Sequence, residues 1–89
     1  MAEDRPNEKH EKMYEIVVNG QAHSVESQTV TFDEVVKIAF PEKADNPELT
    51  FVVTYRKAHE PKEGSLAEGG SAEVKKTGTI FNVTHTRRS

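Results

Sequence analysis

The fold of this chain is decided by residues 14–25, YEIVVNGQAHSV. Tyr14, Ile16 and Val18 recur at every second position, which is typical of a strand with one buried face. Asn19-Gly20 follows directly, and this dipeptide tolerates the positive φ angles of a two-residue type I′ turn. The stretch therefore predicts a β-hairpin. Its opposed pairs are Val18 with Gln21, Ile16 with His23, and Tyr14 with Val25.

A short helix is predicted after this hairpin, from the N-cap Thr31 to about Phe40. Thr31 and Glu34 have the spacing of a capping box, and Val30 and Val35 that of a hydrophobic staple. Pro41 ends the helix, because the residue before a proline avoids helical geometry. The residues predicted to face the core have helical spacing: Phe32, Val35, Val36 and Ala39.

The rest of the chain predicts two more long strands, at 49–55 and 79–86, and a short one near 73–75. Residues 41–48 are expected to form a loop, and residues 56–71 a long mobile connection in which Gly69-Gly70 is a flexible pair. Residues 1–12 are highly charged and lack Val, Ile, Leu and Phe, so we expect a disordered charged tail. The expected organisation is this tail, a domain at 13–86 and a flexible C-terminal tail at 87–89.

These elements occur in the order β-β-α-β-(β)-β, which has one economical arrangement. A hairpin, one covering helix and later strands of the same sheet bury a single apolar face against the helix. We therefore predict an α+β fold of the ubiquitin-like β-grasp type, with a mixed sheet of 4–5 strands packed on one helix.

Composition excludes several classes of function. The 89 residues hold 12 Lys and Arg against 15 Asp and Glu, a net charge of −3, which argues against nucleic-acid binding through phosphate contacts. The chain has no cysteine, hence no disulfide, thiolate zinc site or cysteine nucleophile. It also has no apolar run long enough to span a bilayer and no signal-peptide pattern at its start. A soluble cytoplasmic protein without a membrane partner is the expectation.

No motif for catalysis, metal or cofactor binding is found. His10, His23, His59 and His85 are scattered and lack ligand spacing. The serines lie in no nucleophile elbow, and the glycines of residues 64–70 lack the lysine of a phosphate-binding loop. We therefore expect a protein that is not an enzyme and needs no cofactor.

Three stretches together resemble the bacterial multiubiquitin-type domains. They are residues 14–20, YEIVVNG, residues 31–41, TFDEVVKIAFP, and residues 79–84, TIFNVT. Residues 51–55, FVVTY, fit the same pattern. The resemblance covers roughly residues 13–86 and includes no catalytic signature.

The resemblance implies a ubiquitin-like modifier whose C-terminal carboxylate is adenylated and transferred to a nucleophile. The implied partners are an E1-like activating enzyme, an E2-like conjugating enzyme, a JAB-type protease and target proteins. The conjugation tail would be Arg87, Arg88 and Ser89, whose arginines suit acidic enzyme surfaces. Unlike ubiquitin, this sequence does not end in diglycine, which weakens the related sulfur-carrier interpretation. The alternative is a β-grasp interaction domain that is never conjugated.

A second candidate site lies on the sheet face opposite the helix. If Ile16, Val53 and Phe81 face the helix, strict alternation places their neighbours on the open face. The apolar neighbours predicted to form a partner-binding patch there are Val17, Val52 and Ile80. The competing interpretation is that scattered exposed β-branched residues merely suit strands.

Overall fold

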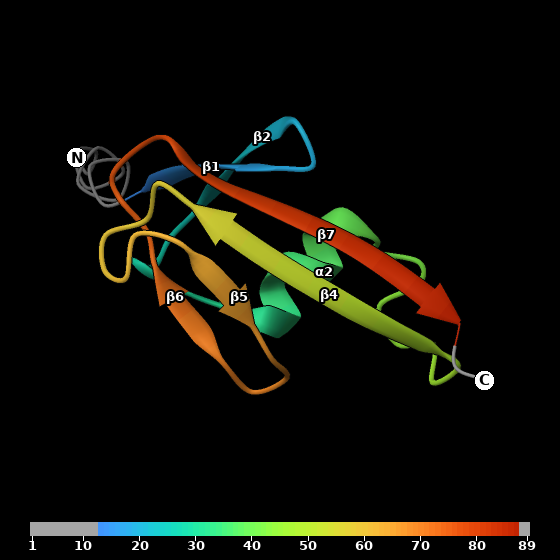
Figure 1. The fold of residues 1–89 in the computed structure, drawn as a ribbon. Helices are drawn as coiled ribbons and strands as arrows, with labels where there is room; N and C mark the ends of the chain where they lie inside the picture. The colour runs from blue at the N-terminus through green and yellow to red at the C-terminus, as the bar shows by residue number, and fades with distance from the viewer. Residues whose placement is uncertain (1–12, 88–89) are drawn as a thin grey trace, which may run out of the picture.

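The computed structural model describes residues 13–87, and the predictions for residues 1–12, Arg88 and Ser89 lie outside this range. Seven strands and one helix follow one another along the described chain, with the helix crossing one side of the long strands β4 and β7 (Figure 1). The elements are β1 (Tyr14–Val18), β2 (Gln21–Val25), β3 (Thr29–Thr31), α2 (Phe32–Ala39), β4 (Leu49–Arg56), β5 (Gly64–Leu66), β6 (Ser71–Glu73) and β7 (Thr79–Arg87).

The main sheet is mixed and has five strands in the order β2-β1-β7-β4-β5. Only β1 and β7 are parallel; β2 on β1, β4 on β7 and β5 on β4 are antiparallel. The first and the last strand of the domain, β1 and β7, thus lie side by side within the sheet. This arrangement, covered by one helix, confirms the predicted α+β β-grasp fold.

The β1–β2 hairpin has the predicted register. Ile16 is opposite His23 and Tyr14 is opposite Val25. Asn19 has φ 51° and Gly20 has φ 84°, the left-handed pair that a type I′ turn requires. The choice of Asn and Gly at these two positions therefore sets the register of the first two strands.

The helix also begins as predicted. The Thr31 side chain accepts from the backbone N–H of Glu34 at 3.1 Å, and the Glu34 carboxylate accepts from the backbone N–H of Thr31 at 2.9 Å. This reciprocal capping box satisfies two backbone donors that the first turn leaves free. The helix ends before Phe40, next to Pro41, so both of its boundaries follow from local sequence.

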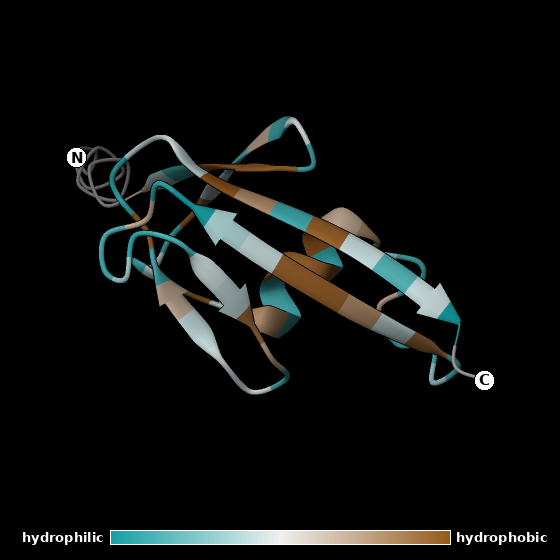
Figure 2. Cartoon of the chain, in the orientation of Figure 1, coloured by the Kyte–Doolittle hydropathy of each residue, from teal (hydrophilic) through white to brown (hydrophobic). Residues whose placement is uncertain are grey.

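One apolar core fills the space between the helix and the sheet. The buried residues of β7 are Thr79, Phe81 and Val83. The strand is hydrophobic mainly in its first part and more hydrophilic toward its end (Figure 2). On the helix, Val35 is fully buried, and Ala39, at the end of the predicted stripe, is half-buried. The other large contributors are Ile16, Val18, Val30, Phe32, Val36, Val53, Tyr55, Leu66 and Val74.

Residues 56–71 differ from the prediction, because they are not a structureless connection. They contain β5, which pairs with β4 as the fifth strand of the main sheet, and they bury Ala58 and Leu66. The short strand predicted near 73–75 lies two residues earlier, as β6, and pairs with β3 in a separate two-stranded sheet. Strands of three residues carry too little periodicity to be recognised.

The Gly69-Gly70 pair is likewise more constrained than a flexible loop. Gly69 has φ +85°, a conformation that L side chains rarely adopt. The Gly70 carbonyl accepts from the backbone N–H of Phe32 at 2.9 Å, so it satisfies a donor in the first turn of α2. The prediction of a flexible pair is therefore wrong, and a side chain at Gly69 would be strained.

The domain boundary also moves by one residue. Arg87, which the sequence assigned to a flexible tail, is the last residue of β7 and is paired with Leu49 of β4. The reason is that β4 offers a partner for every position of β7 from Ile80 to Arg87, which residue type alone does not reveal.

Candidate functional site

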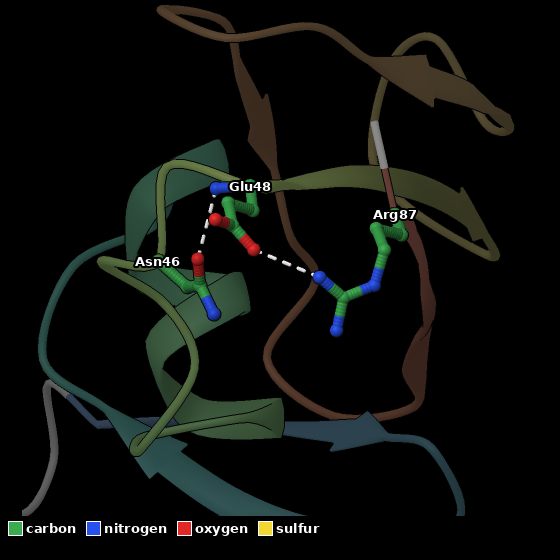
Figure 3. A network of polar contacts seen from close by, with 3 residues as sticks. All are labelled: Asn46, Glu48 and Arg87. Atoms are coloured by element: carbon green, nitrogen blue, oxygen red, sulfur yellow. Dashed lines mark hydrogen bonds and ion pairs between the residues drawn. The ribbon is translucent and has the colours of Figure 1, made fainter. Parts of the chain in front are cut away.

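The far end of β7 is where the predicted conjugation tail leaves the fold. In Figure 1 this end lies at the opposite end of the molecule from the described start of β1. Here Arg87 Nη1 donates to Glu48 Oε1 at 2.8 Å (Figure 3). The side chains of Arg87 and Glu48 are 72% and 68% exposed, so the ion pair is solvated and contributes little to stability.

The loop before β4 holds Glu48 in place. The Glu48 N–H donates to Asn46 Oδ1 at 2.8 Å (Figure 3), an Asx turn that fixes the backbone just before the strand. Leu49 N–H donates to the Asn46 carbonyl at 3.2 Å. Asn46 therefore presents the Glu48 carboxylate to the last residue of β7.

An aromatic cluster supports the same end of the sheet from the helix side. Phe40, which follows α2, lies edge-on to His85 with ring centroids 4.8 Å apart. Phe51 of β4 is 6.0 Å from His85 and 6.1 Å from Phe40. All three residues are half-buried, so the core is open to solvent at this end.

The open face of the sheet does not gather the three predicted apolar residues into one patch. Val17 and Ile80 are directly paired across β1 and β7, and both are half-buried. Val52 is 48% exposed and is paired with Thr84. Thr84 lies four positions after Ile80 along β7, about 13 Å at the rise of a strand. The alternation was predicted correctly, but Val52 lies apart from the Val17–Ile80 pair.

Asn19 provides a polar link that sequence reasoning missed. Its Nδ2 donates to the Val83 carbonyl at 3.1 Å, and its Oδ1 accepts from the Val83 N–H at 2.8 Å. The side-chain amide thus continues the hydrogen bonding between β1 and β7 past the end of β1, as a backbone group would. An Asn-Gly turn signals a hairpin, but not that its amide reaches a strand 64 residues away.

Within 13–87, no group of three or more His, Cys, Asp or Glu side chains is placed to hold a metal ion. His23 and His85 are half-buried in the sheet and His59 is exposed, while His10 lies outside the described residues. No helix in this part of the chain is long and apolar enough to cross a membrane.

Comparison with family models identifies the domain. The multiubiquitin model matches residues 14–87. The chain belongs to the multiubiquitin family. Neither the curated proteins nor the solved structures compared with the chain gave a match. The matched range of this multiubiquitin domain starts with β1 and ends with the last residue of β7, so the family unit coincides with the folded unit.

Two features of the multiubiquitin domain's β7 end escaped prediction. Glu48 and Asn46 were assigned only to a loop, although Asn46-Pro47-Glu48 carries the asparagine of an Asx turn as a local signal. The cluster of Phe40, Phe51 and His85 joins residues that lie far apart in the sequence, and no local pattern predicts it.

Proposed function

We propose that this multiubiquitin domain is a ubiquitin-like modifier of a bacterial conjugation system, and that it acts through the carboxylate that follows β7. The carboxylate would attack the α-phosphate of ATP, forming an acyl adenylate and releasing pyrophosphate. A nucleophile of an enzyme or target would then attack the acyl carbon and release AMP. The domain itself supplies the carboxylate and a recognition surface, and the chemistry belongs to its enzymes.

The observation that carries this proposal is the match of the family model over the whole folded unit, residues 14–87. The structure supports it, because β7 leads the chain out at the far end of the molecule (Figure 1). The partners in this proposal are an activating enzyme, a conjugating enzyme, a JAB-type protease and target proteins, all in the cytoplasm. The Val17–Ile80 pair on the open sheet face is the proposed contact for one of them.

The test is intact-mass analysis of the protein incubated with a multiubiquitin-system activating enzyme, ATP and Mg²⁺. We expect a mass increase at the C-terminus from an adenylate or an enzyme ester. Deleting Arg88 and Ser89 should abolish it, since the carboxylate would then sit on Arg87, which is held by β4 and Glu48. Replacing the same two residues by Gly-Gly keeps the length and should preserve the reaction.

An unmodified parent that nevertheless forms a stable complex with the enzyme would contradict the proposal. It would favour the alternative, an interaction domain that is never conjugated. Melting temperatures of the parent and both variants should agree, because the changes leave residues 13–87 intact.

A further inference from the structure

Two hollows of opposite charge adjoin each other at the far end of the β4–β7 pair. The first, of about 330 Å³, is lined by Lys43, Asn46, Leu49, His85, Thr86 and Arg87. The second, of about 280 Å³, lies between the helix and the loop before β4. Asn46 and Leu49 line both, so the two hollows share a wall.

The first hollow is basic. Lys43 and Arg87 line it, and no residue of its described lining is acidic. Glu48 lies beside it and takes one N–H of Arg87, but a guanidinium has five donors and keeps the others. The first hollow is therefore locally positive, although the net charge of the chain is −3.

The second hollow is acidic. Asp33 of α2, Asp45 of the loop and Glu68 after β5 line it, against the single cation Lys37. Its apolar walls come from Phe32, Val36, Ala44, Leu49 and Phe51. All four charged residues are exposed, so they can meet a partner without moving out of the core.

We propose that these paired hollows are a docking surface for a second copy of this chain. A twofold axis through the shared wall places the basic hollow of each copy against the acidic hollow of the other. The half-buried Leu49 then lies at the axis and can cover its counterpart. The surface is self-complementary because both charges occur side by side on one molecule, and such complementarity selects and orients partners.

The test uses charge reversals at two exposed loop residues whose side chains make no hydrogen bond in the described structure, Lys43→Glu and Asp45→Lys. In the first variant the new carboxylate offsets Arg87, so the basic hollow becomes neutral. In the second the new ammonium and Lys37 offset Asp33 and Glu68, so the acidic hollow becomes neutral. Sedimentation equilibrium over a concentration series should show a monomer–dimer equilibrium for the parent. Each variant alone should raise the dimer Kd at least about tenfold.

An equimolar mixture of the two variants supplies the decisive result. In a mixed dimer the acidic hollow of the first variant meets the basic hollow of the second. One of the parent's two attractive contacts is thereby restored, so the mixed dimer should form more tightly than the dimer of either variant alone. It should weaken as salt rises, because the charges are exposed. Lys62→Glu and Glu63→Lys make the same charge changes on exposed residues away from both hollows, and should leave the parent equilibrium unchanged.

Three outcomes would overturn the proposal: a parent that stays monomeric at every concentration, single variants that dimerise like the parent, or a mixture that associates no more tightly than either variant alone. If the parent is monomeric, the surface would instead be a binding site for a different protein. Activation by the conjugation enzymes is a separate property, since the monomer carries the complete β7 end.

Discussion

The two halves of β7 differ in what surrounds them. In its first half, 79–83, the strand pairs with β1 up to Phe81 and with β4 from Ile80 onward, and the Asn19 side chain bonds Val83. Alternate side chains of this half are buried completely or nearly so. From Thr84 to Arg87 it keeps only β4 as a neighbour, and its side chains are exposed or half-buried. The first half of β7 thus stabilises the domain, and the second half leads to the proposed conjugation tail. We expect substitutions in the first half to affect unfolding, and those in the second to affect interactions.

The largest difference in the free energy of unfolding is expected between alanine substitutions of two phenylalanines that face the helix. Phe81 lies in the first half and is fully buried, whereas Phe51 is half-buried against the second half. Phe81→Ala should lower the free energy of unfolding by about 3–5 kcal/mol, and Phe51→Ala by less than about half of that. Urea titration followed by circular dichroism measures both. Equal losses would refute the distinction between the two halves.

A smaller effect is expected at the buried hydroxyl of the first half. Thr79 is fully buried; its Oγ1 donates to the Lys57 carbonyl at 2.9 Å and accepts from the Lys75 N–H at 3.0 Å. Thr79→Val keeps the shape but leaves both backbone groups without this partner, at a cost of about 1–3 kcal/mol. Thr84→Val, at an exposed position of the second half, is the control and should change stability by less than about 0.5 kcal/mol. A neutral Thr79→Val would show that water satisfies these groups.

The next largest effect on stability is expected at Asn19, whose side chain links the β1–β2 turn to β7. Asn19→Gly tolerates the positive φ at this position but removes both side-chain hydrogen bonds to Val83. We expect a loss of about 1–2 kcal/mol, with faster amide hydrogen exchange at Val83 measured by NMR. Asn82→Gly, which makes no such bond, would separate this effect from the general cost of glycine in a strand. Unchanged exchange at Val83 would contradict a role for the amide in holding the strands together.

The smallest effect is expected at the end of the second half. Arg87→Gln removes the ion pair with Glu48, whose partners are both largely exposed, and should cost less than about 0.5 kcal/mol. The difference in melting temperature between the variant and the parent should be nearly the same at low and at high salt. A loss above about 1 kcal/mol would mean that the β7 end is part of the cooperative core.

Most of the fold could be predicted wherever a short stretch carries its own signal. Asn19-Gly20 fixes the hairpin, and Thr31 with Glu34 fixes the helix start, because each acts over two to four residues. The missed strands β3 and β5, and β6, which was predicted two residues too late, have three residues each. They form only because a partner strand is near. The candidate site was predicted less well. The open face follows from alternation, but the distance of Val52 from Val17 and Ile80 depends on which strands are paired.

The sequence by itself determined the hairpin register, the helix boundaries, the face of each long strand and the family. These properties depend on local backbone preferences and on the period of apolar residues. Only the tertiary structure decided that Arg87 belongs to β7, that Asn19 binds Val83 and that hollows of opposite charge adjoin at Leu49. Each of these joins residues tens of positions apart, and such contacts follow from strand order and packing rather than from any local pattern.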